Sequence, residues 1–108
     1  MITQKDKEQL NSLSMEMILL AGDAREKIMK ALTACETRDF TTADTYLQAA
    51  VTEINQAHIL QTETVQKEAM EQDYYYSMLF THAQDTLMTI QSEYNIALHM
   101  AAILKTYG

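Results

Sequence analysis

The sequence is a 108-residue chain with a formal net charge of −7, which argues against nucleic-acid binding because the phosphate backbone requires a basic surface. It contains no proline and only two glycines, a composition that permits long unbroken helices. The lone Cys35 excludes an internal disulfide, and no stretch reaches the roughly 18 uninterrupted apolar residues of a membrane span. We therefore expect a single all-helical domain over residues 1–108, located in the cytoplasm and without direct membrane insertion.

A first long helix is predicted over residues 3–33. Apolar residues recur there at spacings of three and four, which places them on one face of a helix. This stripe comprises Leu10, Leu13, Met17, Leu20, Ala24, Ile28, Ala31 and Cys35. The helix gives way to a short polar turn at residues 36–40, after which Thr41 or Thr42 offers an N-cap and Phe40 can pack back onto the next helix.

A second helix with the same periodicity follows the turn. Its apolar positions are Ala43, Leu47, Ala50, Ile54, Ala57 and Val65. The pattern fades in the charged segment at residues 67–73, which offers little to bury and is predicted to be a mobile loop.

A third helix is predicted to begin between residues 74 and 77 and to continue to about residue 105. It carries two apolar arcs, about 80–100° apart at ~100° per residue. One arc contains Leu79, Ala83, Ile90, Ala97 and Leu104, and the other contains Phe80, Leu87, Tyr94, Leu98 and Ala101. Because one stripe suffices for packing in a small bundle, the second arc predicts contact with something outside the monomer. Long helices with short connections predict an antiparallel up-down-up three-helix bundle.

The residues best suited to chemistry form a polar cluster in the third helix, His82-Ala83-Gln84-Asp85. His82 and Asp85 lie about 60° apart round a helix and share one face. A neutral imidazole is a nucleophile that can accept and release a phosphoryl group. An aspartate on the same face can orient the ring or bind a hard cation. The alternative is that both residues are ordinary surface or interface side chains.

Three other positions give weaker signals. His58 is interpreted first as a histidine bonded to a neighbouring helix, with a role beside His82 as the alternative. Gly22 lies within the first helix, where glycine costs ~1 kcal/mol relative to alanine. Close helix–helix approach is the favoured explanation for this glycine, and room for a group attached to His82 is the alternative. His99 is assigned no function.

These residues also form a recognisable pattern over roughly residues 15–105. The matching segments are Ala21-Gly22-Asp23-Ala24-Arg25, Asp39-Phe40, Ala57-His58 with Gln61-Thr62, and His82-Ala83-Gln84-Asp85-Thr86-Leu87-Met88-Thr89. In this order they resemble the enzyme IIA components of the lactose/cellobiose class of the bacterial sugar phosphotransferase system. The segment in the third helix is the most specific part of the resemblance.

The resemblance implies a homotrimer of three-helix bundles assembled through the third helices. The phosphorylated histidine of the family falls on His82, and its buried aspartate falls on Asp85, where three copies hold Mg²⁺ or another divalent cation. His58, Gln84 and Gly22 are candidates for supporting roles around His82.

The resemblance also implies the two partners of the chain. The phosphoryl donor is the carrier protein HPr, and the acceptor is a cysteine of the cognate IIB protein, in the uptake of lactose-, cellobiose- or chitobiose-type sugars. Family members usually carry a second histidine where this chain has Thr86. That difference leaves the phosphoryl acceptor in place and removes a neighbouring imidazole.

Two other interpretations stay open at the level of sequence. The chain could be a non-catalytic helical interaction module in which His82 and Asp85 are ordinary interface residues. It could also carry a structural metal site built from His82 and Asp85 alone.

Overall fold

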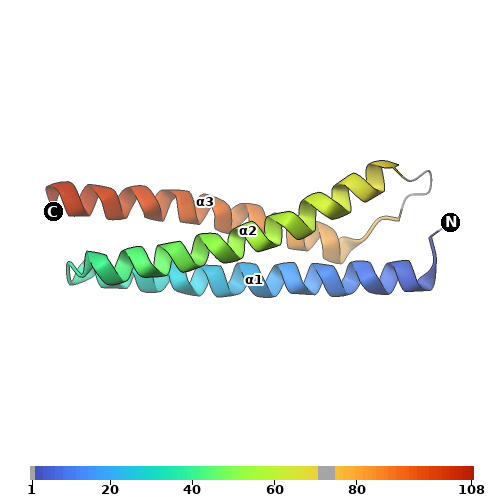
Figure 1. Ribbon diagram of the computed structural model, residues 1–108, viewed down its shortest axis with the longest axis horizontal. Helices are drawn as coiled ribbons and strands as arrows, with labels where there is room; N and C mark the ends of the chain where they lie inside the picture. Colours follow the sequence, from blue (N-terminus) through green and yellow to red (C-terminus); the bar gives the residue numbers. More distant parts are fainter. Residues whose placement is uncertain (1, 71–74) are drawn as a thin grey trace.

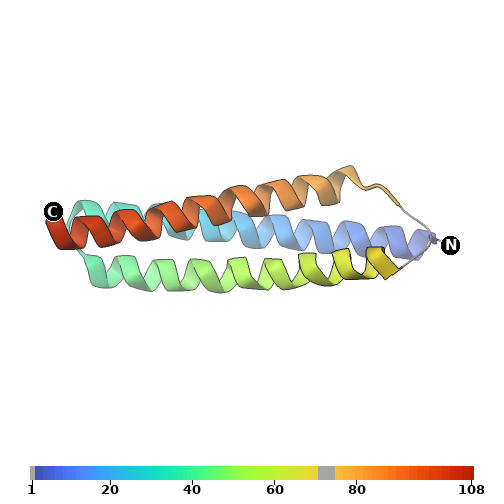
Figure 2. The ribbon, with the colours of Figure 1, turned by 90° about the horizontal axis from the view of Figure 1, so that it is seen from above.

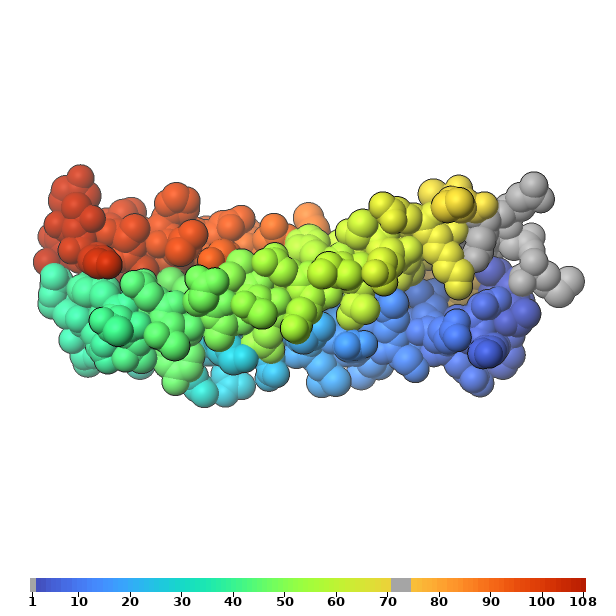
Figure 3. All heavy atoms as spheres, in the orientation of Figure 1, coloured from blue at the N-terminus to red at the C-terminus, as the bar shows by residue number. Residues whose placement is uncertain are grey.

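The computed structural model describes residues 2–70 and 75–108, and the predicted all-helical fold is confirmed across them. Helix α1 spans Gln4–Glu36, α2 spans Phe40–Met70 and α3 spans Met78–Tyr107. The three helices lie side by side in an elongated bundle of 57 × 19 × 18 Å (Figures 1 and 3).

Contacts between the helices establish their directions. Arg25 of α1 meets Glu93 of α3, and Lys7 of α1 lies over the ring of Tyr75 just before α3 begins. Helices α1 and α3 therefore run in the same direction. Helix α2 runs the opposite way between the two ends of the bundle, as the views from the side and from above both show (Figures 1 and 2).

Alanine side chains line the seams between the helices. Every helix contributes three of them to the core, namely Ala21, Ala24 and Ala31, then Ala43, Ala50 and Ala57, then Ala83, Ala97 and Ala101. Larger residues, among them Met17, Ile28, Leu47, Ile54, Leu87 and Ile90, alternate with these alanines. Small side chains let the helix axes approach closely, and the larger ones fill the spaces between them at the density of a protein interior.

Both predicted apolar arcs of α3 pack inside the monomer. Ala83 and Ile90 of the first arc and Phe80 and Leu87 of the second are all buried. The prediction that the second arc contacts something outside the monomer is therefore wrong, because α1 and α2 together cover a span of α3 wide enough for both. The exposed members of the two arcs are Leu98 and Leu104, near the end of α3. A different side of α3 carries the exposed residues Met78, Met88, Ile96, Met100 and Ile103.

The turn between α1 and α2 is closed by Asp39, not by Thr41 or Thr42 as predicted. One carboxylate oxygen of Asp39 accepts the backbone N–H of Thr42 at 3.2 Å, and the other accepts the Thr42 hydroxyl at 2.7 Å. Aspartate is as good an N-cap as threonine, and it stands directly before the first helical residue, Phe40. Arg38 takes a positive φ of 60° here, a conformation that lets the chain leave α1.

Helix α2 ends later and α3 begins later than the sequence pattern suggested. Helix α2 continues to Met70, so the predicted loop at 67–73 is wrong for residues 67–70, and residues 71–73 lie outside the described part. Helix α3 begins after Ser77, whose buried hydroxyl accepts the Phe80 N–H at 3.0 Å. This cap, five residues before His82, fixes the start of α3.

Two isoleucines of α2 provide a matched test of this packing. Ile54 is 2% exposed in the core, whereas Ile59 is 58% exposed on the same helix. We expect Ile54→Ala to lower the free energy of unfolding by about 2–5 kcal/mol, because it leaves a cavity among close-packed side chains. Ile59→Ala should change it by less than about 0.5 kcal/mol. Equal losses for the two variants in urea denaturation would contradict the packing described.

The Asp39 cap predicts a dependence of stability on pH. Hydrogen bonds from the Thr42 side chain and backbone hold the pKa of Asp39 below its ordinary value of 3.8. The ionised cap therefore stabilises the fold fully above the unfolded-state pKa, and this stabilisation is lost as the pH falls through the lower folded-state pKa. Asp39→Asn keeps a capping oxygen without titrating, so the variant should lose less stability than the wild type between about pH 5 and pH 3. An unchanged acid dependence in thermal unfolding would contradict this role.

Candidate functional site

His82 lies in the second turn of α3 with its side chain exposed to solvent. Its neighbours Phe80 and Ala83 are buried, and they hold this turn of the helix against the bundle. Within the described part of the chain, no residue forms a hydrogen bond or ion pair with the His82 ring. The imidazole is therefore accessible to a molecule that approaches from outside.

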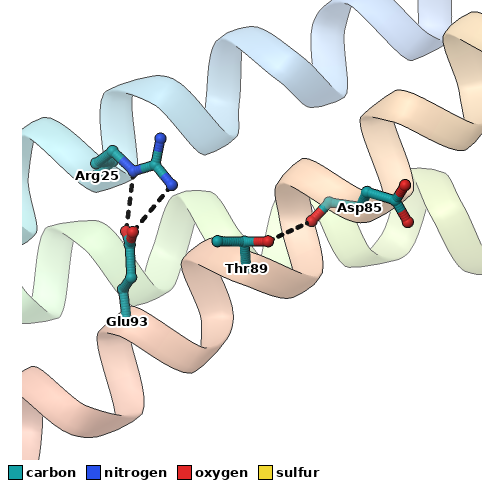
Figure 4. A network of polar contacts seen from close by, with 4 residues as sticks. All are labelled: Arg25, Asp85, Thr89 and Glu93. Atoms are coloured by element: carbon teal, nitrogen blue, oxygen red, sulfur yellow. Dashed lines mark hydrogen bonds and ion pairs between the residues drawn. The ribbon is translucent and has the colours of Figure 1, made fainter.

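Asp85 is exposed one turn further along α3, on the same face as His82. Its backbone carbonyl accepts the Thr89 hydroxyl at 2.8 Å, whereas its carboxylate has no hydrogen-bond or ion-pair partner among the described residues. Thr89 lies between Asp85 and the ion pair formed by Arg25 and Glu93 (Figure 4). The carboxylate oxygens are therefore available as ligands.

Arg25, three residues after Gly22, joins α1 to α3. Its Nε and Nη2 donate to the two carboxylate oxygens of Glu93, both at 2.9 Å (Figure 4). The hydrogen bonds to Glu93 raise the pKa of the guanidinium. Because both side chains are nearly half exposed, the pair contributes little to stability. Glu93 is separated from Arg25 by 68 residues, so no local sequence pattern pointed to this contact.

His58 connects α2 to α3, as its favoured interpretation predicted. Its Nδ1 lies 3.2 Å from Oε1 of Gln61, and its Nε2 makes a closer contact with Oε1 of Gln91. Gln91 stands nine residues after His82, which is about 13 Å along the helix at ~1.5 Å per residue. The structure therefore places His58 beside Gln91 and not beside His82.

Gly22 does not mark a close approach between helices, so the favoured explanation of this residue is wrong. A Cβ at this position would meet nothing within 4 Å. The buried Ala21 and Ala24 on either side provide the close packing instead. Because Arg25 lies opposite Glu93, the parallel register puts Gly22 near the level of Ile90, about 12 Å along α3 from His82.

The remaining candidate, Gln84, is half buried and lies about 200° round α3 from His82 at ~100° per residue. The structure therefore brings together His82 and Asp85 alone among the predicted site residues. Across residues 2–70 and 75–108, no group of three or more histidine, cysteine, aspartate or glutamate side chains converges as metal ligands. None of the helices in this part of the chain is long and apolar enough to cross a membrane.

Comparison with known families identifies the chain. Residues 12–105 match the family described as the lactose/cellobiose-specific IIA subunit of the PTS system. The chain belongs to this family. The match includes all the segments, from Ala21 to Thr89, on which the resemblance in the sequence was based.

Two relatives of the chain are lactose-specific components. The lactose-specific EIIA component of Staphylococcus aureus is 40% identical over 84 residues, which cover 78% of this chain and 82% of that protein. The corresponding component of Lactococcus lactis is 35% identical over 100 residues, which cover 93% of this chain and 95% of that protein.

Solved structures of the family share the fold. PtcA from S. mutans superposes with a TM-score of 0.87 at 30% identity, covering 96% of this chain and 99% of that one. The cellobiose-specific enzyme IIA from Bacillus anthracis gives a TM-score of 0.82 at 31% identity, covering 98% and 93%. The IIA(Chitobiose) of Escherichia coli, solved in complex with HPr, gives 0.80 at 26% identity, covering 90% and 94%.

Proposed function

We propose that this IIA chain is a cytoplasmic phosphocarrier that accepts a phosphoryl group on His82 from phosphorylated HPr and passes it to a cysteine of the cognate IIB protein. The observation that carries this proposal is the exposed imidazole of His82, which no other described side chain engages. The solved complex of the Escherichia coli relative with HPr supports the choice of donor. The sugar delivered would be of the lactose, cellobiose or chitobiose type, as the names of its relatives suggest.

The transfer consists of two in-line displacements at phosphorus. The lone pair of a neutral His82 nitrogen attacks the phosphorus of the donor phosphohistidine, and the donor's P–N bond breaks with its electron pair returning to the donor imidazole. The acceptor thiolate then attacks the same phosphorus, and the P–N bond to His82 breaks. Both steps require alignment and exclusion of water, which the docked partner supplies.

A methionine side chain next to the site suits a surface that serves two partners in turn. Met78, one turn before His82, is 76% exposed. Unbranched, polarisable methionine side chains adapt to contacts of different shape. The same docking surface can therefore receive the donor and then the acceptor.

We also propose that the up-down-up bundles assemble as a homotrimer through the exposed side of α3. Ile96, Met100 and Ile103 fall within an arc of about 60° at ~100° per residue, and all are exposed in the single chain. A contiguous apolar stripe of this kind is typical of a surface covered by another protein. Asp85 lies inside this arc, so three copies would bring three carboxylates together.

A divalent cation such as Mg²⁺ suits the proposed meeting point of these carboxylates. Asp85 offers hard oxygen ligands without competing hydrogen bonds among the described residues. One chain provides a single such ligand, so the site would depend on assembly. The cation would supply the charge neutralisation that three like charges in an apolar environment require.

The three histidines of the chain make a direct test of the phosphoryl acceptor. Incubation with phosphorylated HPr should label the wild type with an acid-labile, base-stable phosphoryl group. His82→Ala should abolish the label, whereas His58→Ala and His99→Ala should retain it, because neither of these rings is the proposed acceptor. Absence of label on the wild type would favour the interaction module, and label on His82→Ala would contradict the assignment.

The role of Asp85 can be tested by the oligomeric state. Wild-type protein should sediment as a trimer in Mg²⁺ and dissociate after metal chelation, because the carboxylates then repel one another. Asp85→Asn has nearly the same size without the charge, so it should remain trimeric in the presence of chelator. A wild-type trimer that is indifferent to chelation, or a monomer at every metal concentration, would contradict the proposed cation site.

A further inference from the structure

Thr86 stands one helical turn after His82 on α3. At ~100° per residue the two side chains lie about 40° apart round the helix, and residues at this spacing have Cβ atoms about 5–6 Å from each other. Because the Cα–Cβ bonds of a helix tilt toward its N-terminus, the Thr86 side chain leans back over the turn that carries His82. No described residue fixes the exposed His82 ring, so a group attached to that ring can come within hydrogen-bonding reach of Thr86.

The hydroxyl of Thr86 is free, unlike those of the threonines on either side of it in α3. Thr81 donates to the backbone carbonyl of Ser77 at 3.1 Å, and Thr89 donates to the carbonyl four residues before it at 2.8 Å. The equivalent acceptor for Thr86 is the His82 carbonyl, but within the described part of the chain the Thr86 hydroxyl bonds neither to it nor to any other group. Thr86 therefore holds an unused hydrogen-bond donor beside the proposed phosphoryl acceptor.

Thr86 differs in chemistry from the other side chains one turn away from His82 on α3. The positions three and four residues to either side are Met78, Leu79, Asp85 and Thr86. Methionine and leucine have no donor, and a carboxylate only accepts hydrogen bonds and repels a phosphoryl group. Among these four positions, Thr86 alone can donate to a phosphoryl oxygen.

The position of Thr86 is also partly shielded from water. Thr86 is half buried and lies about 20° round α3 from Glu93, whose carboxylate reaches Arg25 of α1. Seven residues before this pair stand Ile18 on α1 and Thr86 on α3, so the parallel register sets these two side chains opposite each other. Ile18 is itself half buried against the core. A hydrogen bond beside an apolar neighbour is stronger than the same bond in open water.

We propose that the Thr86 hydroxyl donates a hydrogen bond to a terminal oxygen of the phosphoryl group while that group is carried on His82. This inference rests on the proposed function, because it concerns the phosphorylated form of the same site. The hydrogen bond stabilises the charge on the phosphoryl group and restricts its rotation about the P–N bond. The hydroxyl keeps its proton throughout, so the bonds made and broken in the two displacements are unchanged.

Removal of this hydroxyl with little change of shape tests the proposal. At equilibrium the phosphoryl group divides between HPr and this chain according to the free energies of the separate proteins, so the division is independent of how the two proteins dock. Thr86→Val should shift it about threefold to tenfold toward phosphorylated HPr, because one hydrogen bond to the phosphoryl group is lost. Thr86→Ser keeps the hydroxyl and should stay close to the wild type. Thr81→Val removes a hydroxyl that Ser77 already engages, so this control should leave the division unchanged.

The ³¹P spectrum of the phosphorylated protein reports the hydrogen bond itself. A donor favours the more highly charged form of the phosphoryl group, so Thr86→Val should raise the pKa of that group in a ³¹P titration. A wild-type division of the phosphoryl group in Thr86→Val, or an equal shift in Thr81→Val, would overturn the inference and leave the proposed function standing. A wild-type chain that takes no phosphoryl group from phosphorylated HPr would overturn both.

Discussion

Close packing along the alanine-lined seams determines what the third helix can present to a partner. Ala83, Ala97 and Ala101 bring the inner side of α3 against α1 and α2, and Leu87 and Ile90 fill the remaining space. The inner arc of α3 is therefore buried against the other two helices. Any residue on the opposite side, including His82 and Asp85, is directed outward by the same contacts that stabilise the bundle.

The polar residues divide into two groups according to whether the chain itself satisfies them. His58 contacts two glutamines, and Arg25 is bound by both oxygens of Glu93. The ring of His82 and the carboxylate of Asp85, by contrast, have no such partner within the described residues. A relative in this family has been solved in complex with HPr, so we interpret the unsatisfied groups as those available to a partner. The unsatisfied groups are those that we propose to meet phosphorus and a cation, and the satisfied ones hold helices together.

Much of the fold could be predicted because it depends on local periodicity. Spacings of three and four residues are enough to locate three helices, and the motif around His82 is sufficient to suggest the family. The orientation of the α3 arcs could not be predicted, since hydrophobicity alone does not tell how wide a span of one helix two neighbours will cover. Asp39 and Thr42 can both cap a helix, and which of the two does so depends on where α1 ends. Gly22 lies outside the apolar stripe that the sequence places on the inner face of α1, and it was misinterpreted because a glycine within a helix was assigned to close packing without regard to that stripe. The Arg25–Glu93 pair was missed because it spans two helices.

The central claim is that His82 is ready for phosphorylation without any opening of the bundle. It is tested most directly by comparing ¹H–¹⁵N spectra of the protein before and after phosphorylation by its donor. The account predicts a shift of the His82 ring nitrogens, with backbone changes confined to the first turns of α3 and the facing surface of α1. Widespread changes at buried positions such as Ala50 and Ile54 would show that the core must rearrange to expose the imidazole, and would contradict it.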